Sequence, residues 1–145
     1  MGFTPEHVAI SVSNLDRSVA FYVEVLGMRL DRTIDAPPER GLGRIVGLPG
    51  CSARIAHLVP ADGSRFMVEL FEYRDPTGRP LATDRTQADL GISHVGFTSH
   101  DARADYARLR ERGVVCLGEP VEFRPGVWVF YFRGPDGEVC ELRET

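Results

Sequence analysis

The sequence contains the same order of predicted secondary structure twice, and this repeat limits the possible folds more than any other feature. His7 and His94 open equivalent strands at an offset of 87 residues. Gly27 and Gly113, which end the helices that follow, lie at an offset of 86. The register therefore slips by one residue over a whole strand and helix. We interpret the repeat as a duplication in which each half has the order strand, helix and three strands.

Periodicity predicts the individual elements, because apolar residues alternate in half-buried strands and recur every three or four residues in helices. In the first half we expect strands at residues 7–12, 28–34, 53–59 and 66–73. A capping box at Ser13 to Asp16 predicts the start of a helix of about three turns that ends at Gly27. In the second half we expect a helix at residues 101–112 and strands at 92–98, 114–117, 127–132 and 139–143. The fold class is therefore α+β.

Residues 35–51 interrupt this pattern with three prolines and four glycines around a short apolar piece. Residues 42–48 could form one or two helical turns. The segment is too long for a plain hairpin, so it is either a lid or binding loop or a disordered insertion. The sequence leaves both alternatives open.

Composition narrows the function classes. A length of 145 residues with 43% hydrophobic and 26% charged residues predicts one soluble globular domain, without disorder or a membrane span. All 17 basic residues are arginine, which excludes a Schiff-base lysine and a P-loop lysine. The net charge is -4 and the arginines are scattered, so we expect no nucleic-acid partner.

The three cysteines are far apart in the sequence and form no C-x-x-C pair. Cys51, Cys116 and Cys140 therefore predict neither a disulfide framework nor a zinc knuckle. Residues 1–10 lack the apolar run of a signal peptide. We expect a cytoplasmic protein.

Each half also places one carboxylate within an otherwise apolar strand, in a shared Glu-Leu context. These are Glu69 and Glu141, and with His7 and His94 they make two imidazoles and two carboxylates, related two by two. A buried carboxylate costs several kcal/mol unless it is paired or bound to a cation. Arg143 could neutralise Glu141, but no neighbouring arginine serves Glu69.

Nitrogen and oxygen donors without a thiolate suit one divalent ion, such as Zn, Ni, Co, Mn or Fe(II), in a site open to water or substrate. Three other polar residues are not expected to take part. We predict that His57 packs in the core or lines a pocket, that His100 is a solvated cap, and that Glu72 faces solvent because it points away from Glu69.

Four segments carry a family resemblance: residues 7–28, 66–73, 94–97 and 134–142. Together and in this order they resemble the vicinal-oxygen-chelate superfamily, which includes glyoxalase I, methylmalonyl-CoA epimerase, extradiol dioxygenases and bleomycin-resistance proteins. The resemblance implies a single domain over residues 1–145, with βαβββ modules at about 5–75 and 90–144 whose sheets form a cup around a metal. It places His7, Glu69, His94 and Glu141 on the four ligand positions. It also implies a homodimer, with the cup completed within one chain or across two.

A ligand set of His, Glu, His and Glu resembles glyoxalase I, whereas the epimerases usually have Gln at the second position. The residues after Glu69 depart from the glyoxalase I pattern, which argues against a glutathione-dependent substrate. We therefore expect a metal-dependent lyase or isomerase/epimerase that forms an enediolate or enolate of a small 2-oxo or thioester substrate. Either Glu69 or Glu141 could be the catalytic base. The alternatives are a protein that sequesters a drug or natural product without catalysis, and an Fe(II) extradiol dioxygenase.

The pocket wall is expected to come from residues 127–132, whose alternation creates two faces. Trp128, Phe130 and Phe132 share one face, and Val129 and Tyr131 share the other. One face should line the cup and the other should pack against a helix. Arg44 and Arg124 could bind a substrate carboxylate or phosphate, although loop arginines are more often simply solvated.

Overall fold

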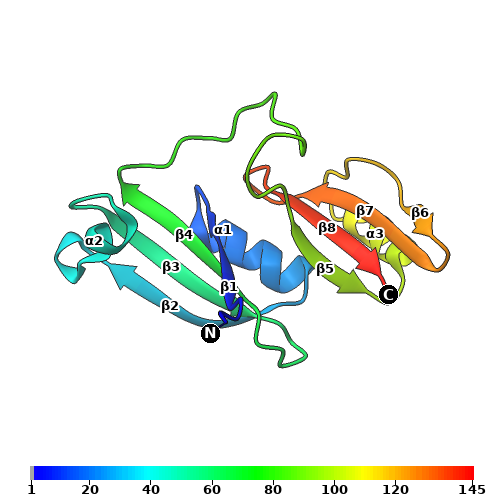
Figure 1. The fold of residues 1–145 in the computed structure, drawn as a ribbon, viewed down its shortest axis with the longest axis horizontal. Coiled ribbons are helices and arrows are strands. Elements are labelled where there is room, and N and C mark those ends of the chain that lie inside the picture. The colour runs from blue at the N-terminus through cyan, green and yellow to red at the C-terminus, as the bar shows by residue number, and fades with distance from the viewer. Residues whose placement is uncertain (1) are drawn as a thin grey trace. The chain divides into compact units, whose positions relative to one another are not determined.

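The computed structural model describes residues 2–145, which divide into two compact units, residues 2–80 and 81–145. Each unit contains one four-stranded mixed sheet and few helices (Figure 1). None of Cys51, Cys116 and Cys140 forms a disulfide within residues 2–145. No helix within residues 2–145 is long and apolar enough to cross a bilayer.

The first unit forms the predicted strand, helix and three strands. Its elements are β1 (His7–Ser11), α1 (Leu15–Ala20), the π-helical continuation η1 (Phe21–Val25), β2 (Arg29–Ala36), the 3-10 turn η2 (Pro38–Arg40), α2 (Leu42–Val46), β3 (Ser52–Val59) and β4 (Met67–Asp75). The sheet order is β1-β4-β3-β2, with β1 parallel to β4 and the other neighbours antiparallel.

The second unit repeats this topology. Its elements are β5 (Val95–Ser99), α3 (Ala102–Glu111), β6 (Val121–Arg124), β7 (Val127–Arg133) and β8 (Val139–Glu144). The sheet order is β5-β8-β7-β6, and β5 is parallel to β8 as β1 is to β4. The predicted α+β class and the βαβββ repeat are therefore confirmed.

One predicted strand is wrong. Residues 114–117 form only an isolated bridge, from Cys116 to Phe132, and the outer strand of the sheet is β6 instead. Gly118 and Pro120 separate the two segments, and proline cannot donate a ladder hydrogen bond. The turn Pro125-Gly126 before β7 is the hairpin signal that should have predicted β6.

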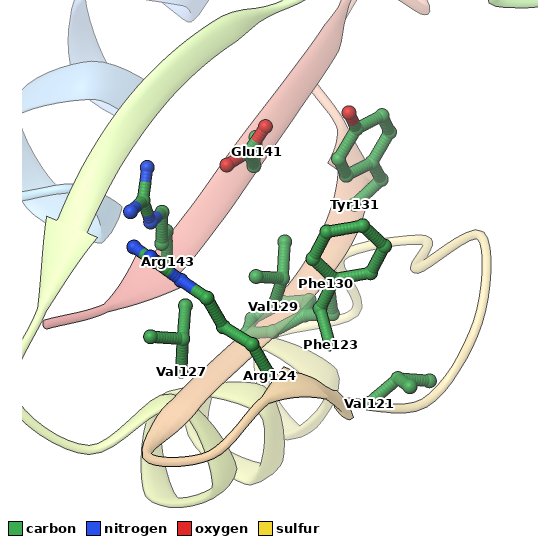
Figure 2. A pocket seen from close by; sticks show the side chains of 9 residues that line it. All are labelled: Val121, Phe123, Arg124, Val127, Val129, Phe130, Tyr131, Glu141 and Arg143. Carbon is green, nitrogen blue, oxygen red and sulfur yellow. The ribbon is translucent and has the colours of Figure 1, made fainter.

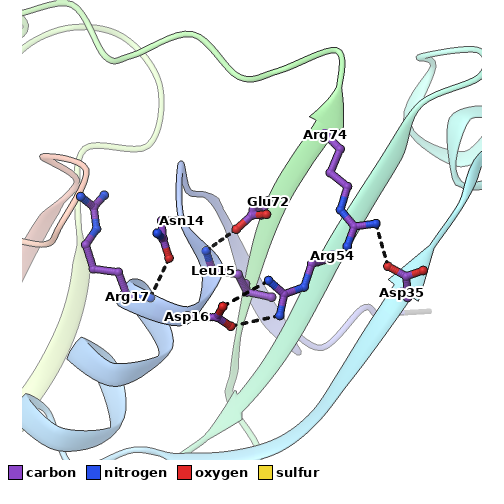
Figure 3. Close-up of polar contacts among 8 residues, drawn as sticks. All are labelled: Asn14, Leu15, Asp16, Arg17, Asp35, Arg54, Glu72 and Arg74. Atoms are coloured by element: carbon purple, nitrogen blue, oxygen red, sulfur yellow. Dashed lines mark hydrogen bonds and ion pairs between the residues drawn. The ribbon is translucent and has the colours of Figure 1, made fainter.

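The start of α1 also differs from the predicted capping box. Asn14 is the N-cap, and its side chain accepts a hydrogen bond of 2.9 Å from the Arg17 backbone N–H (Figure 3). Ser13 accepts from the Arg17 side chain instead, at 3.0 Å. Asp16, the second residue of α1, forms an ion pair with Arg54 of β3 at 3.0 Å. This ion pair and the packing of α1 both hold the helix on the sheet.

The insertion at residues 35–51 is ordered and folds back onto the first sheet. Leu42 of α2 and Cys51 are buried with Ala53 and Ile55 of β3 in one apolar cluster, against which Phe71 and Tyr73 also pack. Side chains two residues apart on a strand share a face, so this cluster covers the face of β3 and β4 that also carries His57 and Glu69. Of the two alternatives for this segment, disorder is therefore wrong.

In the second unit, α3 covers one face of the sheet through β7. The Arg103 guanidinium lies 4.7 Å from the centre of the Trp128 ring, and the Tyr106 and Phe130 rings meet edge to face at 5.4 Å. The aromatic face of β7 is therefore the helix-packed face. Val129 and Tyr131 lie on the opposite face.

Candidate functional site

In the first unit, Glu69 lies in the middle of β4 with a histidine on each side. His7 Nε2 is 3.4 Å from Glu69 Oε2, and His57 Nε2 is 3.0 Å from Glu69 Oε1. The register explains the second contact, because His57 and Glu69 are direct partners across β3 and β4. The Glu69 side chain is 15% exposed, so both imidazoles act on a carboxylate that is largely removed from water.

His57 is the residue that the sequence-based prediction underestimated. It contacts the candidate ligand Glu69, and its Nδ1 is buried without a hydrogen-bond partner within residues 2–145. The pairing of β3 with β4 places His57 there, and no repeat in the sequence indicates it, because the second unit has a tyrosine at this position.

In the second unit, His94 and Glu141 form the corresponding pair. His94 lies just before β5, and its Nε2 is 2.9 Å from Glu141 Oε2 on β8. Tyr131 is the cross-strand partner of Glu141, and its ring centre lies 4.8 Å from that of His94. Burial raises the pKa of the Tyr131 phenol, and the charge of Glu141 raises it further, so the phenol is protonated at neutral pH.

These separations fit ligands of one ion. Two donors bound at about 2.1 Å to the same centre lie about 3.0–3.4 Å apart at octahedral or tetrahedral angles. The pair His7 and Glu69 and the pair His94 and Glu141 are both near this range. No group of three or more His, Cys, Asp or Glu side chains placed to hold a metal ion occurs among residues 2–145. Each unit thus presents two of the four predicted ligands.

The prediction that Glu72 faces solvent is wrong. Its carboxylate accepts a hydrogen bond from the backbone N–H of Leu15, the first residue of α1 (Figure 3). Glu144 does the same in the second unit, accepting from the N–H of Ala102 at the start of α3 at 2.9 Å. The prediction that Glu72 points away from Glu69 is consistent with this contact, but the opposite face of the strand is covered by the helix.

Other predicted residues have simpler outcomes. Arg143 forms no ion pair with Glu141, whose partner is His94. His100 is exposed as predicted, but the N-cap of α3 is Asp101, whose side chain accepts from the Ala104 N–H. Arg44 lies in α2 and is exposed.

A pocket of about 650 Å³ lies on the open face of the second sheet, opposite α3 (Figure 2). Glu141 and Tyr131 line one end of it. Its remaining lining residues are Val121, Phe123, Arg124, Val127, Val129, Phe130 and Arg143. The pocket therefore combines a predicted ligand and possible base with an apolar wall and two guanidinium groups, which is the usual make-up of a small-molecule site.

Sequence comparison identifies the family. A model of the Glyoxalase/Bleomycin resistance protein/Dioxygenase superfamily matches residues 4–142. The chain belongs to this superfamily. Within it, the chain is 34% identical over 145 residues to a 2-epi-5-epi-valiolone epimerase from Actinomyces sp, a match that covers 94% of this chain and 76% of the relative. It is 29% identical over 140 residues to a probable chloroplastic lactoylglutathione lyase from Arabidopsis thaliana, and covers 35% of that relative's length.

Solved structures of the superfamily share the fold. A glyoxalase family protein from Bacillus cereus matches with a TM-score of 0.86 and 28% identity, over 96% of this chain and 91% of that one. An antibiotic binding protein from Streptomyces sp. CB03234 matches with a TM-score of 0.65 and 25% identity, over 99% and 98% of the two chains. Catalytic and binding members are thus both among the similar proteins.

Proposed function

We propose that this protein is a divalent-metal-dependent lyase or isomerase/epimerase that moves a proton next to a carbonyl of a small 2-oxo or thioester substrate. The observation that carries the proposal is the pairing of a histidine with a strand glutamate at ligand separation in both units. Relatives named as an epimerase and as lactoylglutathione lyases support the reaction class.

His7, Glu69, His94 and Glu141 would hold the ion, either within one chain or across a homodimer. When bound, a divalent cation supplies stabilisation of the negative charge that develops on an enediolate or enolate. His57 Nε2 lies 3.0 Å from Glu69 Oε1, and this pairing keeps the carboxylate oriented. Glu69 is therefore the more firmly held of the two carboxylates.

Glu141 is our candidate for the base. It lines the pocket, where a substrate carbon can reach its carboxylate, whereas Glu69 is fastened by two imidazoles. Glu141 would take the proton from the carbon next to the carbonyl and return it to the neighbouring carbon or to the opposite face of the same carbon. The Tyr131 phenol, whose pKa is raised by burial and by the charge of Glu141, stays protonated beside that carboxylate at the same end of the pocket.

The test is metal content and activity of the purified protein and of two variants. We expect one divalent ion per site by elemental analysis, and loss of stoichiometric metal in the double variant Glu69→Ala, His94→Ala. Glu141→Gln should retain part of the metal affinity but lose at least about a thousandfold in kcat, as expected for loss of a general base. Substrates to screen are methylglyoxal hemithioacetals, methylmalonyl-CoA and, with oxygen consumption as the readout, catechols.

A binding protein without catalysis is the second candidate. It is favoured by the similarity to an antibiotic binding protein and by the apolar wall of the pocket. The two candidates differ in their response to metal removal. If the wild type binds no metal after reconstitution and the double variant keeps full affinity for a bound natural product, the lyase or isomerase proposal is wrong.

A further inference from the structure

The pocket of the second unit contains two arginines that have no partner within the described chain. Neither Arg124 nor Arg143 forms a hydrogen bond or ion pair with another residue of 2–145, and the Arg143 Nε is buried without an acceptor. Other arginines of the described chain pair with a carboxylate, for example Arg54 with Asp16 and Arg74 with Asp35. A buried N–H without an acceptor costs free energy, which an anion from solution can offset by accepting its hydrogen bond.

The strand register brings the two guanidinium groups to one place. Arg143 on β8 lies beside Val129 of β7, and Arg124 on β6 lies beside Val127 of β7. The two arginines therefore flank β7 from opposite sides, two strand spacings apart and offset by two residues along β7, so their backbones are about 12 Å apart. Figure 2 shows both side chains extending over the valines, with their guanidinium groups directed toward one another.

No carboxylate of the pocket neutralises them. Glu141 is the carboxylate that lines the pocket, and its oxygen is paired with His94 at 2.9 Å. Glu122, on the same strand as Arg124, accepts from the Gly126 N–H and closes the turn between β6 and β7. The arginine end of the pocket is therefore positively charged, while the opposite end carries Glu141.

We infer that Arg124 and Arg143 bind an anionic group of the substrate, either a carboxylate or a phosphate. Guanidinium groups recognise the paired oxygens of both anions in a fork geometry. Arg143 lies two residues from Glu141 on β8, so the two side chains leave the same face of the strand with their Cα atoms about 7 Å apart. The substrate class is thus a small 2-oxo compound or thioester with an anionic tail several bonds from its carbonyl. Assigning the anion to the substrate rests on the proposed function, but the anion site itself does not.

The experiment titrates the full-length protein, without added metal, with inorganic phosphate and with succinate at constant ionic strength. Calorimetry measures the titration. The fluorescence of the single tryptophan, Trp128, which lies on the opposite face of β7, is a second readout. Arg124→Gln, Arg143→Gln and Arg143→Lys are compared with Arg65→Gln, an exposed arginine of the first unit. Dimethyl succinate serves as the uncharged analogue of succinate.

We expect saturable binding of at least one anion, no binding of dimethyl succinate, and a loss of affinity of about tenfold or more in both glutamine variants. Arg143→Lys should recover only part of the loss, and Arg65→Gln should bind like the wild type. The tighter of the two anions indicates whether the tail is a phosphate or a carboxylate. Because Arg124 is exposed, its variant tests the site even if Arg143→Gln fails to fold.

Absence of saturable binding, equal affinity for dimethyl succinate, or an equal loss in Arg65→Gln would overturn the inference. Metal content is measured on a parallel sample of the same preparation after reconstitution with a divalent ion. Anion binding without metal binding would reject the proposed function but support the anion site. Metal binding without anion binding would reject the anion site but leave the proposed function supported.

Discussion

The two units place a histidine beside a strand glutamate in the same way, but they differ in the residue opposite that glutamate and in what covers the face around it. The first unit has His57 opposite Glu69, and the insertion at residues 35–51 packs on the same face. The second unit has Tyr131 opposite Glu141, and its face is an open pocket. Under the proposed function, this difference divides the roles: the first unit holds its ligands firmly, and the second receives the substrate.

The helix caps follow the same repeat. Glu72 and Glu144 each lie three residues after a predicted metal ligand, and each accepts the first backbone N–H of its unit's helix. In each unit, one strand therefore presents a predicted ligand glutamate to one face and a helix-capping glutamate to the other.

Core truncation should have the largest effect and tests whether the two units are energetically equivalent. Leu70 and Leu142 follow the two ligand glutamates and are 0% and 5% exposed. We expect Leu70→Ala and Leu142→Ala each to lower the free energy of unfolding by about 2–5 kcal/mol, measured by urea denaturation, because both leave a cavity. If only one of the two variants loses less than about 1 kcal/mol of unfolding free energy, the two units are not energetically equivalent.

Removing the donor opposite each glutamate should have the next largest effect. If the metal proposal is right, His57→Phe weakens metal affinity by about 10–100-fold, because Glu69 loses the group that orients it. Tyr131→Phe should have a smaller effect on metal affinity and a larger one on kcat. Competition with a chromophoric chelator measures the affinity, and His57→Gln, which can still donate, is the matched control. A larger loss of metal affinity in Tyr131→Phe than in His57→Phe would contradict the roles assigned to the two units.

Removing a helix cap should cost about 1 kcal/mol in either unit. Glu72→Ala and Glu144→Ala each leave the first N–H of a helix without its acceptor and remove a negative charge near the helix N-terminus. Chemical denaturation measures the loss, with the exposed Glu119→Ala as the control. If the two variants differ in their loss of unfolding free energy by more than about 1 kcal/mol, the two units share a topology but their helix caps do not contribute equally to stability.

The smallest effect concerns Tyr73, beneath the insertion of the first unit. Burial, and then the neighbouring Cys51, raises the pKa of its phenol. A group with a raised pKa in the folded state gives its full contribution below its unfolded value of about 10 and loses it as the pH rises through the folded value. Stability should therefore fall above about pH 10 and fall less in Tyr73→Phe. Denaturation at several alkaline pH values tests this, and an identical slope in both proteins would contradict it.

Much of the fold could be predicted because it depends on local patterns. Alternation predicted seven of the eight strands to within a few residues, and Gly27 and Gly113 end their helices at positive φ values of 75° and 78°. The strand β6 was missed because its pairing with β7 depends on a turn that was assigned to a loop. The pairing of His7 with Glu69 and of His94 with Glu141 was predictable because the repeat places them in equivalent strands.

The sequence by itself determined the duplicated order of elements, the four ligand-type residues and the family, because each of these depends on residue type and spacing along the chain. Only the tertiary structure decided that His57 contacts Glu69, that Glu72 caps a helix, and that Arg124 and Arg143 share a pocket. These contacts join strands whose relative register is set by sheet pairing and by packing against helices. A single-residue slip in that register would exchange the two faces of a strand, so the contacts exist only once the sheet has formed.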